Sequence, residues 1–214
     1  MSGADGIRAV VFDFGGVIWD MRLDLARAIE ERYGLPRHAL MRTLYDTDDW
    51  RRVHLGLGDR EAWRAAAHRA LEAEAGRPLP PLHDEWTAGM RLIEDNVALV
   101  RRLRPSYRTQ VLSNADATLP ERMRLLGVYD LFDDVVVSAH VGVAKPDRRI
   151  YELAASRLAL SPEACVFIDD SERNVEAARE AGMRAVLFRV GRDDLRAQLA
   201  ALGVDVGAAA SEAS

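Results

Sequence analysis

The stretch Val10–Ile18 constrains the fold more than any other part of this sequence. Its apolar, largely β-branched run Val10–Phe12 breaks on Asp13 and is soon followed by Gly15 and Gly16. Such a run predicts a buried strand that ends in a tight turn, with the acid at the strand's carboxyl edge. Open α/β sheets bind their ligands at that edge. A single acid there is also common as an ordinary solvated side chain, so this stretch alone predicts a strand rather than a site.

Three later segments place further polar residues at strand ends or in the loops beside them. They are Val111–Asn114, Ala144–Asp147 and Val166–Ser171. Helical patterns separate these segments, and strands that alternate with helices predict right-handed crossovers and a parallel sheet. We therefore predict the α/β class, with a Rossmann-like, doubly wound parallel sheet.

A helix-rich region without strand signals lies between the first and second core strands. Its predicted helices cover Leu23–Ile29, Pro36–Tyr45, Arg60–Ala75 and His83–Ile93. We expect this region, residues 19–89, to form a small helical-bundle cap domain. Residues 1–18 and 90–205 then form the core domain. Residues 206–214 lack the apolar content to pack, which predicts a mobile C-terminal tail.

The four segments, in this order and with a long insert after the first, resemble the motifs of the haloacid dehalogenase-like (HAD) superfamily of aspartate-nucleophile hydrolases. The resemblance extends from about Arg8 to Phe188 and so includes nearly the whole chain. It implies that Asp13 and the pair Asp169-Asp170 lie on adjacent strands. The Asp-Phe-Gly-Gly-Val form of the first motif is similar to the branch that includes sugar-1-phosphate phosphatases.

The resemblance implies a magnesium site built on the acids. Asp13 would be both the nucleophile and a ligand, the backbone carbonyl of Phe14 a second ligand, and Asp170 a direct carboxylate ligand. Asp169 and Asn174 match positions that hold metal-bound water. Carboxylate oxygens close to one point suit octahedral Mg²⁺, which keeps waters and bridges to a substrate phosphate. The alternative from the residues alone is a set of side chains that cap the following helix.

Other matched positions imply phosphate binding. Ser113 and Asn114 match the motif whose hydroxyl and amide groups hold phosphate oxygens, although a Ser-Asn pair after a strand is also a common turn. Lys145 matches the residue that offsets negative charge on the nucleophile and the transferred phosphoryl group. We expect the cap to set specificity. Its candidate contact residues are Asp20, Asp46, Trp50, Arg51 and His54.

One position departs from the family pattern, because Gly15 stands where most phosphatase members carry a second Asp. The leading hypothesis is a Mg²⁺-dependent phosphatase that acts on a small phosphorylated metabolite through an aspartyl-phosphate on Asp13. One alternative is a 2-haloacid dehalogenase, which uses the same nucleophile without metal. Another is a phosphate-binding or partner-binding pseudoenzyme that has lost its acid at position 15.

Composition limits the remaining possibilities. A net charge of -5 without any Lys/Arg-rich run argues against nucleic-acid binding. The apolar runs stay below the ~18 residues of a membrane helix, so we expect no membrane partner. Cys165 is the single cysteine, which excludes a disulfide within the chain, and it lies in a predicted strand. A cytoplasmic location is the default expectation, and the oligomeric state stays open.

Overall fold

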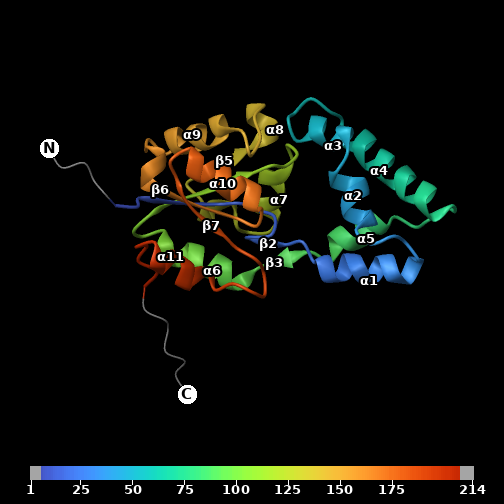
Figure 1. The fold of residues 1–214 in the computed structure, drawn as a ribbon, viewed down its shortest axis with the longest axis horizontal. Helices are drawn as coiled ribbons and strands as arrows, with labels where there is room; N and C mark the ends of the chain where they lie inside the picture. The colour runs from blue at the N-terminus through green and yellow to red at the C-terminus, as the bar shows by residue number, and fades with distance from the viewer. Residues whose placement is uncertain (1–5, 208–214) are drawn as a thin grey trace, which may run out of the picture.

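The computed structural model describes residues 6–207 and contains a five-stranded parallel sheet with the strand order β5-β4-β1-β6-β7 (Figure 1). The strands are β1 (Ala9–Phe12), β4 (Arg108–Ser113), β5 (Asp134–Val137), β6 (Cys165–Asp169) and β7 (Arg184–Leu187). All four neighbouring pairs run parallel. The predicted α/β class and doubly wound parallel sheet are therefore confirmed.

The central strand β1 pairs with β4 on one side and with β6 on the other. Phe12 pairs with Val111 in β4 and with Ile168 in β6. This register brings the carboxyl ends of three strands to one point, and these ends carry Asp13, Ser113 and Asp169. The adjacency of Asp13 and the two later acids, which the family resemblance implied, is present in the structure.

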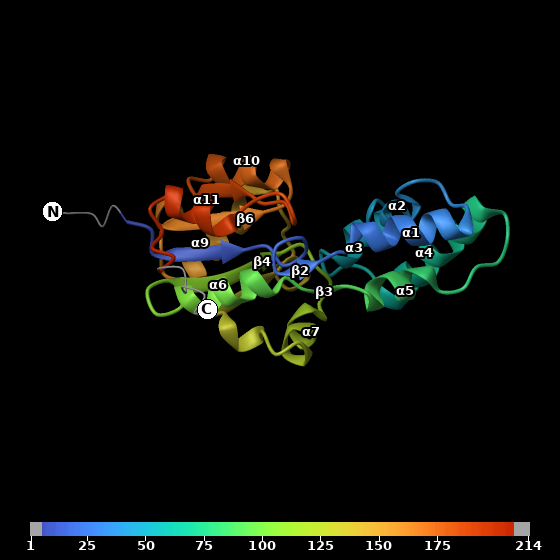
Figure 2. The same cartoon turned by 90° about the horizontal axis from the view of Figure 1, so that it is seen from below.

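Helices cover both faces of the sheet, as Figures 1 and 2 show. They are α6 (Glu94–Leu103), α7 (Leu119–Leu125), α8 (Ser138–Val141), α9 (Arg148–Arg157), α10 (Glu172–Glu180) and α11 (Leu195–Ala201), with short 3₁₀ turns η1 (Tyr129–Leu131) and η2 (Pro162–Ala164). One hydrophobic cluster joins the sheet to α6, α7 and α11, and a second joins it to α9 and α10. The alternating side chains of β1 contribute to both, because successive residues of a strand face opposite sides.

The insert between β1 and β4 extends away from the sheet (Figure 2). Its helices are α1 (Leu23–Tyr33), α2 (Ala39–Tyr45), α3 (Asp48–Val53), α4 (Arg60–Ala75) and α5 (Leu82–Ala88). They share a hydrophobic cluster of their own, in which Trp63, Leu71 and Trp86 are buried. The chain enters and leaves through a short antiparallel pair, β2 (Trp19–Asp20) and β3 (Arg91–Leu92). The boundaries of a separate cap domain at 19–89 remain a prediction.

Local signals explain why helix α4 has the predicted bounds. The Asp59 carboxylate accepts a hydrogen bond from the backbone N–H of Ala62 at 2.6 Å, and Gly76 ends the helix with a φ of 64°. An N-terminal carboxylate cap and a left-handed glycine are the expected ends of a helix. Between Tyr45 and Arg60, where no helix was predicted, Thr47 caps a further short helix, α3, by accepting from the N–H of Trp50.

Across residues 6–207, none of the helices combines the length and the apolar character needed to cross a membrane. The predicted tail 206–214 lies largely outside the described residues, since only Val206 and Gly207 belong to them.

Candidate active site

The carboxyl ends of β1 and β6 bring three acids together. The backbone N–H of Asp13 donates to the carbonyl of Ile168 at 2.8 Å, which continues the parallel pairing past the end of β1. Asp13, Asp169 and Asp170 each offer a carboxylate oxygen, and these three oxygens lie within 4.8 Å of one another. Asp169 is completely buried, whereas Asp170 is exposed. The strand pairing thus builds the acidic cluster that the sequence predicted.

Lys145 lies between two of these acids. Its Nζ is 3.0 Å from Oδ2 of Asp13 and 2.6 Å from Oδ2 of Asp169. Burial raises the pKa of Asp13 to about 7, although the Lys145 ammonium lowers it. Burial lowers the pKa of Lys145, but the two carboxylates outweigh this effect and raise it above its ordinary value. A single ammonium compensates only part of the negative charge of the three acids.

Asp169 is held on both of its oxygens. Oδ2 accepts from Lys145, and Oδ1 accepts from the backbone N–H of Ser171 at 2.8 Å. The side-chain amide of Asn174 donates to the same carboxylate, at 3.1 Å to Oδ1 and 3.2 Å to Oδ2. Asn174 therefore orients Asp169. Its predicted contact with metal-bound water stays a prediction.

The end of strand β4 contributes the hydroxyl of Ser113 and an amide, that of Asn114, which binds the loop carrying Lys145. Ser113 is buried at the end of β4, and its hydroxyl has no hydrogen-bond partner within residues 6–207. Asn114 makes a reciprocal pair with Lys145: its Nδ2 donates to the Lys145 carbonyl, and its Oδ1 accepts from the Lys145 backbone N–H, both at 2.8 Å. Asn114 was predicted only as a phosphate ligand. The structure uses its side chain to fix the loop that carries Lys145.

The backbone of the turn after β1 bears on the prediction that the Phe14 carbonyl is a metal ligand. The carbonyl oxygen of Phe14 accepts from the N–H groups of Ile18 at 2.9 Å and Trp19 at 2.8 Å, and more distantly from Val17 at 3.4 Å. These donors engage the oxygen, so the turn does not support Phe14 as a metal ligand, and that role stays a prediction. The N–H of Phe14 instead donates to Oδ1 of Asp13 at 2.6 Å and helps to hold that carboxylate.

The two glycines of the turn differ in what they permit. Gly16 has a φ of 75°, and a Cβ built on it would lie 2.2 Å from Oδ2 of Asp170. Only glycine fits there, because any side chain would displace that carboxylate. A Cβ on Gly15 would meet nothing closer than Sδ of Met21 at 3.5 Å, an ordinary contact. The missing acid at position 15 is therefore not forced by the backbone.

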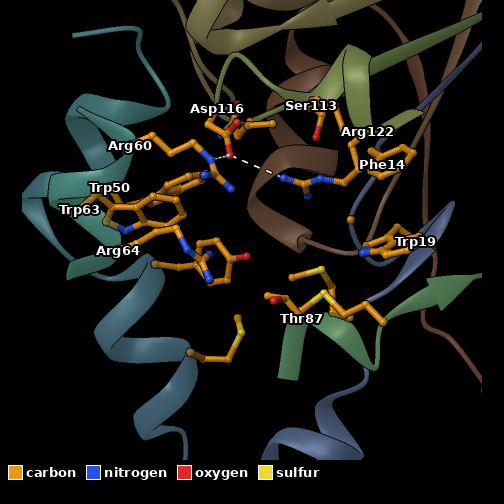
Figure 3. A pocket seen from close by; sticks show the side chains of 18 of the residues that line it. Phe14, Trp19, Trp50, Arg60, Trp63, Arg64, Thr87, Ser113, Asp116 and Arg122 are labelled. Carbon is orange, nitrogen blue, oxygen red and sulfur yellow. Dashed lines mark ion pairs between the residues drawn. The ribbon is translucent and has the colours of Figure 1, made fainter. Parts of the chain in front are cut away.

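A cavity of about 1030 Å³ lies between the sheet edge and the insert, and Asp170, Ser113, Asn114 and Gly15 line its core side. Figure 3 shows its opposite wall, where Trp50 and Trp63 face the interior. Aromatic and sulfur-containing side chains of the insert and its links make much of the lining: Trp19, Met21, Met41, Tyr45, Trp50, Trp63 and Met90. The cavity thus joins a polar floor to a largely apolar roof.

Of the predicted cap contacts, only Trp50 lines this cavity. Arg51 is 59% exposed and pairs with Asp48 on the outer side of α3. The ring of His54 stacks on Trp50 at 5.2 Å between centroids, so it supports the cavity wall from behind. Burial lowers the pKa of His54, with Arg51 contributing.

The other two predicted cap contacts also lie elsewhere. Asp20 accepts from the backbone N–H of Arg22 at 2.9 Å, in the link between core and insert. Asp46 is exposed, and its Oδ1 is 3.8 Å from a guanidinium nitrogen of Arg51. Neither of them lines the cavity.

Sequence reasoning missed the arginines of the cavity. Arg60 and Arg64 come from the first turns of α4, and Arg122 comes from α7 of the core. Arg60 and Arg122 flank the buried carboxylate of Asp116 (Figure 3). With 29 lysines and arginines in the chain, no local pattern singles these out. Asp116, three residues after the second core strand, was the one accessible signal.

The chain matches the haloacid dehalogenase-like hydrolase family over residues 7–182. It belongs to the haloacid dehalogenase-like hydrolases. The predicted HAD family and hydrolase class are thereby confirmed.

Relatives of this HAD hydrolase include named phosphatases. Phosphatase MT3486 of Mycobacterium tuberculosis is 39% identical over 111 residues, which are 50% of this chain and only 51% of that protein. The phosphorylated carbohydrates phosphatase of Thermotoga maritima is 30% identical over 192 residues, which are 84% of each protein. A solved HAD family enzyme from Bacteroides thetaiotaomicron, in complex with magnesium and inorganic phosphate, has a TM-score of 0.70 at 20% identity, over 90% of this chain and 99% of that chain. This last likeness shows the shared fold.

Proposed function

We propose that this HAD hydrolase is a Mg²⁺-dependent phosphatase that acts on a small phosphorylated metabolite through an aspartyl-phosphate on Asp13. The observation that carries the proposal is the position of the Asp13 carboxylate. One oxygen accepts from the N–H of Phe14 and the other contacts Lys145, so the group is fixed at the end of β1. The phosphatase names of the two relatives support the same reaction.

The acids fit a divalent cation. Three carboxylates share one small volume with a single ammonium, and desolvation of the Asp170 carboxylate by the surrounding protein, together with the Asp169 charge, raises the pKa of Asp170 to about 6. A cation there would relieve this surplus negative charge, and hard carboxylate oxygens suit Mg²⁺. We assign Asp13 and Asp170 as its side-chain ligands, with Asp169 as a supporting acid. The carbonyl of Gly15, a residue that lines the cavity, is a second candidate backbone ligand beside that of Phe14. Bound Mg²⁺ would supply positive charge to the substrate phosphate.

In the first step, a carboxylate oxygen of Asp13 attacks phosphorus, and the bond to the ester oxygen breaks with its electron pair. Lys145 stabilises the charge that develops on the phosphoryl oxygens, and the Ser113 hydroxyl donates to one of them. In the second step, water attacks phosphorus, the acyl-phosphate bond breaks, and Asp13 regains its carboxylate. The products are the alcohol and inorganic phosphate.

Gly15 restricts the leaving group. An alkoxide leaves readily only when something donates a proton to it, and a positioned general acid contributes roughly 10²–10⁴-fold. Glycine cannot donate one. We therefore expect a preference for esters of acidic hydroxyls, such as phenols, enols, acyl groups or anomeric sugar hydroxyls.

The test is hydrolysis of 4-nitrophenyl phosphate with and without Mg²⁺, by the wild type and by Asp13→Asn. We expect Mg²⁺-dependent turnover that the substitution lowers by at least about 10³-fold while the protein stays folded. Metal-independent chloride release from 2-chloropropionate would instead identify a dehalogenase. Phosphate binding without any turnover would identify a pseudoenzyme, and either result would refute the proposal.

A further inference from the structure

Two arginines from opposite sides of the cavity face one buried carboxylate. Arg60 begins α4 of the insert, and its Nε is 3.7 Å from Oδ2 of Asp116. Arg122, on α7 of the core, has a guanidinium nitrogen 3.6 Å from the same oxygen. Figure 3 shows both side chains reaching into the cavity on either side of Asp116. Both separations are ion-pair distances beyond hydrogen-bonding range.

Asp116 does not satisfy the donors of these arginines. Its Oδ1 accepts from both the backbone N–H and the hydroxyl of Thr118, at 2.8 and 2.5 Å. Nε of Arg60 is buried and has no hydrogen-bond partner. The guanidinium group of Arg122 donates no hydrogen bond within residues 6–207, where its contact is the 3.6 Å ion pair with Asp116. A buried donor without a partner costs free energy, which a ligand that accepts its hydrogen bond would recover.

The local charge favours a monoanion. Two guanidinium groups share the one buried carboxylate of Asp116, so one of their positive charges lacks a buried counter-charge. Nη1 of Arg60 donates a hydrogen bond to Glu61 at 2.9 Å, but Glu61 is 81% exposed, so water screens its charge. Arg64 differs from the other two, because it donates to Asp84.

The surroundings connect this pair to the proposed reaction centre. Arg60, Arg122 and Asp116 line the same cavity as Ser113 and Asp170. An organic phosphate whose phosphoryl group lies at Asp170 and Ser113 would therefore extend its organic part past the two guanidinium groups. Trp50 and Trp63 of the insert line the same cavity and offer apolar surface to the organic part of such a substrate.

We propose that Arg60 and Arg122 form a subsite for a carboxylate on the organic part of the substrate. This proposal rests on the proposed phosphatase function. Guanidinium groups recognise carboxylates with two parallel hydrogen bonds, and a carboxylate carries the single charge that the pair lacks. The substrate class is thus a phosphate ester of a hydroxy acid. Because one arginine comes from the insert and the other from the core, such a substrate contacts both parts at once.

The experiment compares esters that differ only in this charge. 3-Carboxyphenyl phosphate is assayed against 3-carbamoylphenyl phosphate, and the 4-substituted pair provides a longer reach. Each pair is matched in size and close in leaving-group acidity. We expect the wild type to prefer the carboxylate by roughly tenfold or more in kcat/KM, the range expected for hydrogen bonds to a charged group. Arg60→Gln and Arg122→Gln should each lower that ratio, whereas Arg124→Gln, on the same helix and outside the cavity, should not.

Two results would overturn the subsite. One is a wild-type ratio near one for both pairs while all four esters are hydrolysed, a result that leaves the phosphatase function intact. The other is a ratio that survives both arginine substitutions. Failure to hydrolyse any of the four esters would instead refute the proposed function on which the subsite rests.

Discussion

The charges at the carboxyl ends of β1 and β6 are fixed by short contacts, whereas the arginine pair Arg60 and Arg122 lies farther from the buried carboxylate that it shares. Lys145 lies 2.6 and 3.0 Å from its two carboxylates, and Asp169 is held by three protein groups. Arg60 instead reaches its nearest core carboxylate only at 3.7 Å, with a buried nitrogen unpartnered. Fixed groups suit a reaction whose charges develop at one place in every substrate. Unsatisfied groups suit recognition, because the ligand completes their hydrogen bonds.

The largest effect is expected from a methyl group added to the turn after β1, where it would displace Asp170. Gly16→Ala should reduce Mg²⁺-dependent kcat/KM by about 10² or more, because its Cβ would overlap Asp170 and its φ of 75° would be strained. Gly15→Ala is the matched control and should stay within a few fold of wild type. Assays of both variants across a Mg²⁺ titration check this. Equal losses in the two variants would show that Asp170 is not positioned as described.

Gly15→Asp tests the same turn by adding the acid that most phosphatase members carry at this position. The site has room, since the nearest atom to the new Cβ is Sδ of Met21 at 3.5 Å. Rates in a series of aryl and alkyl phosphates should fall steeply with leaving-group basicity in the wild type and less steeply in the variant. Alkyl phosphates should gain by up to roughly 10²-fold. A shallow slope shared by both proteins would mean that another group supplies the proton.

The insert side can be tested with two neighbouring residues of α3. Trp50→Ala should raise KM for aryl phosphates by about tenfold, because its ring lines the cavity and packs on Trp63 at 4.8 Å between centroids. Arg51→Ala should change KM by less than about twofold, since Arg51 faces solvent. Steady-state kinetics on one aryl phosphate decide the matter. A larger effect at Arg51 would place the substrate outside the described cavity.

The smallest effect concerns stability without metal. The pKa of Asp13 is about 7 in the folded protein against 3.8 ordinarily. The contribution of Asp13 to the free energy of unfolding is therefore fully present below pH ~4, and it is lost as the pH rises through 7. We expect Asp13→Asn to unfold with a free energy higher by about 1 kcal/mol or more at pH 8 in EDTA, and with no such gain at pH 4. His83, whose pKa burial lowers to about 4, has the opposite pH dependence but is common to both proteins. If the unfolding free energies of the wild type and Asp13→Asn changed equally with pH, the raised pKa of Asp13 would be contradicted.

Much of the fold could be read from local patterns. Strands β4 and β6 end on the polar residues Ser113 and Asp169, Asp13 directly follows β1, and Asp59 and Gly76 mark the ends of α4. The links β2 and β3 were missed because two-residue strands carry no periodicity. Helix α3 was missed because its acidic start resembles a turn, and the cap by Thr47 depends on backbone angles.

The candidate site also contains residues that could be predicted from the sequence and residues that could not. Asp13, Ser113 and Asp169 follow strands, so the parallel sheet fixes where they meet. Arg60 and Arg122 lie on helices whose facing sides depend on how the insert packs over the core, which no local spacing encodes. The surroundings of the Phe14 carbonyl could not be predicted for a related reason, because the turn's own hydrogen bonds set its direction.

The most direct test of the account is to trap the covalent intermediate on Asp13. Wild-type protein is mixed with 4-nitrophenyl phosphate and Mg²⁺, quenched in acid within one turnover, reduced with borohydride and analysed by peptide mass spectrometry. Borohydride converts an acyl phosphate to an alcohol, so the account predicts homoserine in place of Asp13, only when both Mg²⁺ and substrate are present. Turnover in which Asp13 stays unmodified, or in which another residue carries the label, would contradict it.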